Sequence, residues 1–253
     1  MCGIAGWYRS GDNKITESEL KSLIIGLQVR GKDATGVAWK SQGYVYTLKS
    51  ASKASDFINL PEFKKAIPEI LDSTWVLLHT RFATHGSPKN YKNNHPVMNK
   101  KGLIIHNGIV TPKQPLDADG ETDSEQLLLH IQKYGWHGIS MLFGSAAFAY
   151  VNFSKPGFYL YTDKLSSLSW TYDLERQMFL FCSTKRILTK AYDVGSVFGM
   201  PKVVINDVPR ATVYHINDGV KKIKEVKLGD RVYDYPQYSG YSIQPPQNIA
   251  GFY

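Results

Sequence analysis

The sequence predicts an α+β domain in which β-sheets are covered by a few helices. The chain has 253 residues, 43% of them hydrophobic and 21% charged, which is ordinary for a protein that buries a sizeable core. Its second half contains a run of short apolar segments rich in β-branched and aromatic residues, which is typical of strands. Helical periodicity is confined to a few segments. The same composition excludes a disordered, collagen-like or coiled-coil chain.

The first forty-eight residues predict a strand, a helix and a hairpin. A strand is expected over residues 2–8. Thr16 and Glu19 have the spacing of a capping box, and apolar residues on one helical face follow them. A hairpin over residues 37–40 and 44–48 comes next, with its turn at Gly43. The apolar face of the helix consists of Leu20, Leu23, Ile24 and Leu27.

Three further helices and eight further strands are expected. A helical stretch over residues 52–71 is predicted to be interrupted at Pro61 and at Pro68, because proline lacks the amide hydrogen of a helix interior. The other helices are predicted over residues 123–134 and 185–191. The strands are predicted at residues 75–79, 103–106, 146–151, 158–162, 168–172, 178–182, 202–205 and 211–216.

The composition changes near residue 228, where tyrosine, proline, glutamine and glycine become frequent. We therefore expect a single domain over residues 1–228 and a tail over residues 229–253. Two interpretations of the tail are open: a flexible segment, or a segment whose aromatic side chains dock on a partner.

The net charge of the chain bears on its possible partners. The 30 basic and 22 acidic residues give a net charge of +8. A scattered, solvated lysine surface and attraction to phosphorylated molecules both fit this excess. No nucleic-acid-binding motif is present, which argues against nucleic acid as a partner. Two lysine clusters stand out: Lys89, Lys92, Lys100 and Lys101, and then Lys221, Lys222, Lys224 and Lys227.

The chain is expected to be cytoplasmic and to bind no membrane. Two cysteines are too few for a disulfide scaffold, which favours a reducing compartment. The longest uncharged run, residues 134–154, is broken by glycine and polar residues and is unsuited to span a bilayer. The start of the chain also lacks the features of a secretory signal.

Cys2 is the first residue with a chemical signature. Removal of Met1 would make it amino-terminal and would place its thiol beside its own α-amine. That amine has a reference pKa of roughly 7.7–8.0, so it can act as a base near neutral pH. A thiol with an attached base is an activated nucleophile. Cys182, within the apolar segment FLFC, is interpreted instead as a core residue.

Six short motifs occur in a fixed order along the chain. They are MCGIAG at residues 1–6, RGKDATG at 30–36, HTRFATHG at 79–86, NNHP at 93–96, HNG at 106–108 and TDSE at 122–125. In order and separation they resemble the glutaminase domain of class II glutamine amidotransferases. The RGxDAxG and HTRxATHG forms are most similar to the glucosamine-6-phosphate synthase and amidophosphoribosyltransferase branches.

The resemblance implies an Ntn-hydrolase αββα four-layer sandwich, with two mainly antiparallel sheets between helical layers. It also implies hydrolysis of L-glutamine to glutamate and ammonia through a thioester on Cys2, with no cofactor. Asn107 and the backbone of Gly108 would form the oxyanion hole, whose donors contribute about 3–4 kcal/mol each.

The resemblance assigns the substrate-binding residues as well. Arg81 would hold the α-carboxylate of glutamine and Asp123 its α-ammonium group, while Thr84 and His85 lie in a loop that covers the substrate. Two supporting residues are also implied. Arg30 would hold the amino-terminal segment in place, and His106 would support the loops of the site.

Simpler interpretations exist for some of these residues. Arg81 is also compatible with a surface salt bridge, and Asp123 with a helix cap. Four of the seven histidines lie in the motifs, which raises the question of a metal site. No HExxH or paired CxxC spacing supports one, so we expect no bound metal.

The segment after residue 216 is too short for a synthase domain, so the ammonia acceptor is expected on a separate synthase subunit. The segment at residues 162–173 also lacks the Gly-x-x-Pro turn usual in the family. Two alternative functions are a catalytically silent regulatory or docking subunit, and an amino-terminal-cysteine amidase that acts on another amide.

Overall fold

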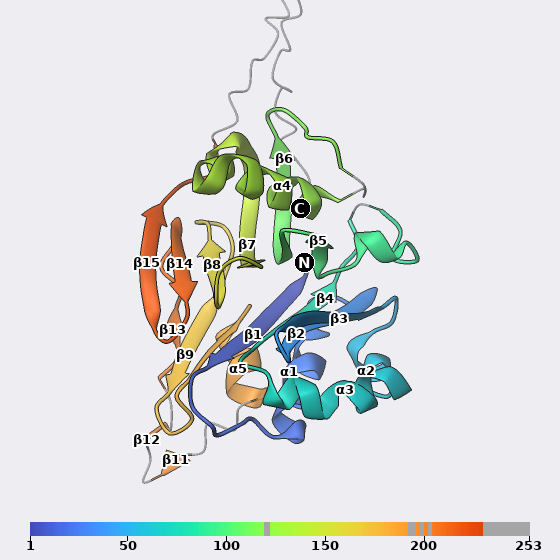
Figure 1. The fold of residues 1–253 in the computed structure, drawn as a ribbon, viewed down its shortest axis with the longest axis vertical. Helices are drawn as coiled ribbons and strands as arrows, with labels where there is room; N and C mark the ends of the chain where they lie inside the picture. Colours follow the sequence, from blue (N-terminus) through green and yellow to red (C-terminus); the bar gives the residue numbers. More distant parts are fainter. Residues whose placement is uncertain (85, 119–121, 192–195, 198–199, 202–203, 230–253) are drawn as a thin grey trace, which may run out of the picture.

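The computed structural model describes residues 1–84, 86–118, 122–191, 196–197, 200–201 and 204–229. Two antiparallel sheets form its centre (Figure 1). The first has seven strands in the order β13-β9-β10-β1-β4-β2-β3. Their bounds are Gly3–Arg9 for β1, Ala34–Ser41 for β2, Tyr44–Ser50 for β3, Trp75–Arg81 for β4, Ser169–Asp173 for β9, Met178–Cys182 for β10 and Asn206–Asp207 for β13.

The second sheet has six strands in the order β15-β14-β8-β7-β6-β5. Its longest pairing joins β6 to β7 in a continuous antiparallel ladder. The bounds are Val97–Asn99 for β5, Gly102–Pro112 for β6, Leu142–Asn152 for β7, Phe158–Thr162 for β8, Thr212–Ile216 for β14 and Val220–Glu225 for β15. A separate two-stranded ribbon joins β11 (Ser196–Val197) to β12 (Met200–Pro201).

Helices cover the outer face of each sheet, and Figure 1 shows the two groups on opposite sides of the molecule. Four helices pack on the first sheet: α1 (Glu17–Leu27), α2 (Ala54–Phe57), α3 (Pro61–Asp72) and α5 (Lys185–Ala191). Helix α4 (Asp123–Tyr134) and the 3₁₀ segment η2 (Gly135–Met141) pack on the second, and a short 3₁₀ turn, η1 (Tyr91–Asn93), precedes β5. The predicted αββα sandwich is therefore confirmed.

Alternation along the strands divides the buried side chains into three apolar layers. In β4, Val76 and Leu78 face the helices, whereas Trp75 and Leu77 face the other sheet. The layer between the sheets also contains Leu103 and Ile105 of β6 and the small Ala147 and Ala149 of β7. Central strands buried on both faces explain why the sequence shows continuous apolar runs here.

Strand β1 is a central strand of the first sheet. It pairs with β4 on one side, where Gly3 faces Thr80, and with β10 on the other, where Ala5 faces Cys182. Ser183 extends this pairing: its hydroxyl accepts the amide hydrogen of Ile4 at 2.8 Å, and its amide donates to the Ile4 carbonyl at 2.8 Å. The start of β1 is thus held on both edges.

Most predicted elements are present, with identifiable exceptions. The helix capped by Thr16 and Glu19 forms with both capping-box hydrogen bonds. The predicted interruption at Pro68 is wrong, because α3 begins at Pro61 and runs through Pro68 to Asp72. Strands β5, β11, β12, β13 and β15 were not predicted from the sequence. The strand predicted at residues 202–205 lies partly outside the described residues, and residues 204–205 are not in a strand.

The lysine clusters separate in space. The cluster at residues 221–227 lies largely on β15, an exposed edge strand, where lysines disfavour pairing with other chains. Lys89 and Lys92 lie before β5, whereas Lys100 and Lys101 lie in the turn between β5 and β6. Within the described residues, no helix has the length and apolar character needed to cross a membrane.

Gly36 lies where the RGKDATG and NNHP segments pack closely against each other. A Cβ built on this residue would overlap the carbonyl oxygen of His95. We expect Gly36→Ala to lower the free energy of unfolding by about 2–4 kcal/mol, because the overlapping atom belongs to the backbone. Urea unfolding measures the change. Gly43→Asn is the control, since Gly43 has a φ of +84° and open space around it. An equal loss in both variants would contradict this packing argument.

Candidate active site

Cys2 lies at the start of β1, beside the end of β4. Its thiol accepts the amide hydrogen of Phe82, with Sγ 3.4 Å from the nitrogen, and donates to the Phe82 carbonyl oxygen at 3.7 Å. Burial raises the pKa of the Cys2 thiol, whereas the Phe82 amide, the chain's terminal amine and Arg81 act to lower it. The thiol is therefore half-buried, with the Phe82 amide and Arg81 favouring its anion.

Arg30 contacts the segment that leads into β1. Its Nε donates to the Cys2 carbonyl oxygen at 2.8 Å, and its Nη2 lies 3.6 Å from the Met1 sulfur. The next residue, Gly31, packs against the backbone of Arg81, where a Cβ would overlap the carbonyl group. The RGKDATG segment thus contacts both the cysteine and the end of β4.

Arg81 is the last residue of β4 and is almost completely buried. Its Nη1 donates to Oδ1 of Asn94 at 3.0 Å, and its Nη2 donates to the Gly86 carbonyl at 2.9 Å. Asp33 fixes the adjoining loop, because its Oδ2 accepts the amide hydrogen of Ala83 at 2.7 Å. Burial lowers the pKa of Arg81, while Cys2, Asp33 and Asp123 act to raise it.

Lys49 holds the segment that contains Asn94. Its Nζ donates to the carbonyl oxygens of Asn94 at 2.9 Å and Pro96 at 3.1 Å, and it lies 4.1 Å from the centre of the Tyr91 ring. Burial lowers the pKa of Lys49 to about 8. The side chain of Asn94 also donates to the Pro88 carbonyl at 2.6 Å, so this loop is tied down at several points.

Asn107 and Gly108 lie on β6 of the second sheet. The Asn107 side chain is buried, and its Oδ1 has no hydrogen-bond partner among the described residues. Gly108 has a φ of +145°, and a Cβ there would overlap the Ser145 carbonyl oxygen. Only glycine fits this position.

Histidines connect the two sheets beside Asn107. The ring of His79, on β4, hydrogen-bonds through Nε2 to the carbonyl oxygen of His106 on β6 at 3.1 Å. The Nδ1 of His106 lies 3.0 Å from the Ser124 hydroxyl of α4. His95 stacks on His79, with the ring centres 3.9 Å apart. This column fixes β6 relative to β4.

Asp123, the first residue of α4, accepts the amide hydrogen of Val110 at 2.9 Å through its Oδ2. No side-chain hydrogen bond of the N-cap residue Thr122 to the helix is present, so Asp123 anchors the helix start to β6 instead. The Asp123 carboxylate acts to raise the pKa of Cys2, and Arg81 acts to lower it. Groups of opposite charge thus act on the thiol from β4 of the first sheet and from α4, which packs on the second sheet.

Buried polar atoms without partners concentrate at this place. Seven such side-chain atoms occur among the described residues. Five of them belong to His95, His106, Asn107 and Thr122. An unpaired buried polar atom costs about 1–3 kcal/mol, so such a concentration is typical of a functional site rather than of a core.

The other predicted residues lie outside this cluster or outside the described part of the chain. Thr84 is exposed on the loop after β4. His85 lies outside the described residues, as does most of the predicted tail. Cys182 is buried in the core between β10 and the helices. Within the described ranges, no group of three His, Cys, Asp or Glu side chains is arranged to hold a metal ion.

Sequence reasoning overlooked the roles of Lys49, Asp33 and Asn94 in holding Arg81. Asp33 and Asn94 lie inside the quoted motifs RGKDATG and NNHP, so a signal for them existed. Lys49 lies in the second strand of a hairpin and no motif marks it; only the folded structure brings it to Asn94.

Comparisons with known proteins show what this architecture is similar to. No protein-family model matches the chain. Among curated proteins, glutamine–fructose-6-phosphate aminotransferase (isomerizing) of Caldanaerobacter subterraneus is 32% identical over 149 residues, covering 54% of this chain and 23% of the relative. The protein of the same name from Rhizobium meliloti is 34% identical over 148 residues, covering 55% and 23%. The matches span less than a quarter of these relatives' length.

Solved structures share the fold. The glutamine phosphoribosylpyrophosphate amidotransferase of B. subtilis, complexed with ADP and GMP, superposes with a TM-score of 0.64 at 15% identity, over 88% of this chain and 49% of that one. A class-II glutamine aminotransferase domain protein from Silicibacter pomeroyi gives a TM-score of 0.54 at 14% identity, over 89% and 100%. The predicted resemblance to class II glutamine amidotransferases is therefore confirmed.

The histidine column makes the fold sensitive to acid. Burial lowers the pKa of His79 from 6.5 to about 3, and it also lowers those of His95 and His106. These histidines take up protons near pH 6.5 in the unfolded chain, whereas in the folded protein their imidazoles stay neutral there. Their contribution to the free energy of unfolding is therefore fully present above pH 6.5 and is lost as the pH falls below it. The loss is about 2 kcal/mol at pH 5 for His79 alone.

Urea unfolding at pH 7 and pH 5 measures this loss. The exposed His137, changed to Asn, provides a control in which the same loss is expected. An unfolding free energy that stays constant between the two pH values would contradict the assignment of buried neutral histidines.

Proposed function

We propose that this protein hydrolyses the side-chain amide of L-glutamine, with Cys2 as the nucleophile. The observation that carries the proposal is the position of the Cys2 thiol. It lies against the Phe82 amide and is influenced electrostatically by both Arg81 and Asp123. Glutamine carries a carboxylate and an ammonium group, so it needs one partner of each sign near the nucleophile.

The proposed reaction begins with removal of Met1, which frees the α-amine of Cys2. That amine takes the thiol proton as Sγ attacks the carboxamide carbon of glutamine. The carbon–nitrogen bond then breaks, and the amine returns the proton to the departing ammonia. Water attacks the resulting γ-glutamyl thioester, which releases glutamate and restores the thiol.

The negative charge that develops on the carboxamide oxygen needs donors that are already in place. We assign this role to the Asn107 side chain and the Gly108 amide, which the His79–His106 hydrogen bond holds next to the first sheet. Preorganised donors of this kind stabilise the transition state more than the substrate.

Arg81 is proposed to bind the α-carboxylate, since a guanidinium can grip both oxygens. Asp123 is proposed to bind the α-ammonium group, and Thr84 and His85 to cover the substrate. Arg30, through its hydrogen bond to the Cys2 carbonyl, is proposed to keep the first residues in register with β4.

We further propose that the released ammonia is used by a synthase carried on a separate chain. The names of the curated relatives describe aminotransferases of glutamine and fructose-6-phosphate, so in those proteins an amino group passes from glutamine to an acceptor. The acceptor is tested by co-purifying the partner and following nitrogen from amide-labelled glutamine into its product.

Cys2 gives the most direct test of the proposed chemistry. Cys2→Ala is expected to lower glutamate production by at least about a thousandfold, because the thioester cannot form. Mass spectrometry of the active protein is expected to show that Met1 is absent. Cys182→Ala is the matched control and is expected to retain activity, since burial raises the pKa of Cys182 to about 12 and keeps it an inert thiol. Unchanged activity in Cys2→Ala would refute the proposal.

Lys49 tests whether the loop around Asn94 positions Arg81. Lys49→Met removes the two hydrogen bonds that hold this loop. We expect KM for glutamine to rise about tenfold, equivalent to about 1.4 kcal/mol, with a smaller change in kcat. Lys92→Met, at an exposed position of the same loop, is expected to leave both constants unchanged. A fall in kcat at constant KM would contradict this positioning role.

A further inference from the structure

A hollow lies at the opposite end of β4 from Arg81. Trp75 begins this strand and borders the hollow, whereas Arg81 ends it, so the two places are about 20 Å apart. The hollow has a volume of about 470 Å³, within the range of small-molecule sites. The term basic groove is used for its six main lining residues: Lys40, Trp75, Met98, Lys100, Phe153 and Lys155.

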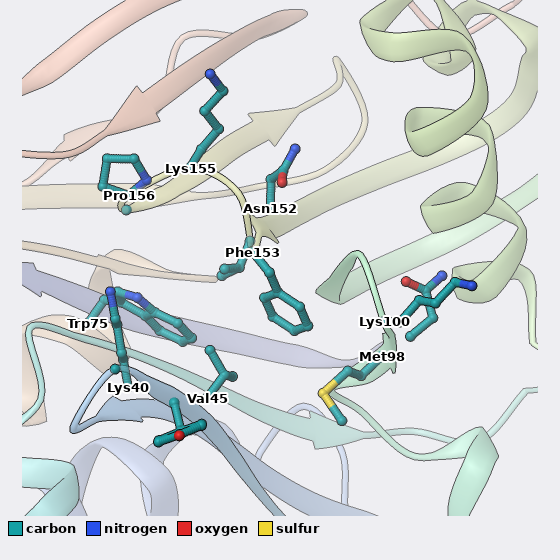
Figure 2. A pocket seen from close by; sticks show the side chains of 14 residues that line it. Lys40, Val45, Trp75, Met98, Lys100, Asn152, Phe153, Lys155 and Pro156 are labelled. Carbon is teal, nitrogen blue, oxygen red and sulfur yellow. The ribbon is translucent and has the colours of Figure 1, made fainter.

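The centre of the basic groove is apolar. Figure 2 shows the Phe153 ring pointing into the space between Trp75 and Met98, with Val45 below it. Met98 is 49% exposed and Phe153 38% exposed, and the neighbouring Tyr44 is 71% exposed. Large apolar side chains exposed together in a concave surface indicate a ligand that covers them.

The rim of the basic groove is positively charged. Lys40, Lys100 and Lys155 line the hollow, and Figure 2 shows the Lys100 and Lys155 side chains extending outward from the apolar centre on different sides. None of the three pairs with a carboxylate of the described residues. Lysines elsewhere do pair, as Lys185 does with Asp207 at 3.3 Å. No aspartate or glutamate of the described residues lines the hollow. This uncompensated charge favours an anionic ligand.

Lys100 and Lys155 also border a second hollow, of about 550 Å³. Its lining includes Trp136 and Tyr159, whose ring centres lie 4.8 Å apart. Lys40, by contrast, also lines a hollow that contains Glu69 and Asp72, whose charges offset its own. The uncompensated charge of the basic groove therefore comes from Lys100 and Lys155. The two lysines thus stand between two aromatic surfaces, a place suited to an anionic group whose ring lies on one of them.

We propose that the basic groove binds a small ligand in which a planar ring is joined to a phosphate-type anion. The ring would lie against Phe153 and Met98, and the anion between Lys100 and Lys155. The site is separate from the cysteine site and does not depend on the glutaminase proposal.

Isothermal titration with AMP, adenosine and inorganic phosphate at low salt tests this inference on the full chain. We expect one AMP per chain to bind, with adenosine and phosphate each at least about tenfold weaker. The double variant K100A/K155A and the single variant F153A are each expected to weaken AMP binding at least about tenfold. The control K64A/K65A removes two exposed lysines of α3 and is expected to bind AMP as the unaltered protein does.

Several results would overturn the inference. They are the absence of AMP binding at about 1 mM, equal binding of phosphate and AMP, or equal weakening by K64A/K65A. Binding of oligonucleotides alone, with steep salt dependence, would assign the surface to nucleic acid instead. Thermal unfolding of each variant separates lost binding from lost folding. Glutamate production by K100A/K155A is expected to stay unchanged.

Discussion

Pairing of β1 on both edges is the constraint on which the site depends. Its hydrogen bonds to β4 and β10, extended by Ser183, fix the position of Cys2, the residue that precedes the strand. Cys2 therefore lies beside Phe82, where an amide hydrogen points to its sulfur. A nucleophile at the start of a loose terminal segment would lose this placement, because chain ends are ordered only where the structure ties them down.

The other half of the site comes from the second sheet, and the histidines determine how the halves meet. The His79–His106 hydrogen bond crosses the sandwich next to Asn107. Buried neutral imidazoles suit this task, since a charged group there would need a counter-ion. Burying them makes the fold less stable in acid and leaves several polar atoms without hydrogen-bond partners. An entirely apolar core would avoid both effects, but it would place no polar groups at the site.

Local sequence patterns predicted much of the fold. Helix α4 has the predicted bounds, and the capping box before α1 forms as its spacing indicates. Pro68 was misjudged because tertiary packing of the buried Phe63, Ile67 and Ile70 maintains α3 across it. Strand β15 carries four lysine or glutamate residues among its six and has no apolar alternation, so no local pattern marked it.

The candidate residues came from ordered motifs, whereas their support did not. Lys49 reaches Asn94 only because the β2–β3 hairpin folds over the loop before β5, a contact between segments 45 residues apart. The basic groove arises in the same way, from turns that are distant in sequence. Hydrophobic periodicity within a short stretch of sequence carries no information about contacts between distant segments. Motifs therefore identified the candidate residues, and the fold identifies the residues that hold them in place.

A glutamine-shaped electrophile, such as the diazoketone analogue of glutamine, tests the central claim most directly. The thiol proton passes to the diazo carbon, and the Cys2 thiolate then attacks that carbon, which expels dinitrogen and leaves a stable thioether. The account predicts one adduct per chain, located by peptide mass spectrometry on an amino-terminal Cys2 and prevented by excess L-glutamine. An adduct on Cys182, or an unmodified Cys2 in protein that still hydrolyses glutamine, would contradict it.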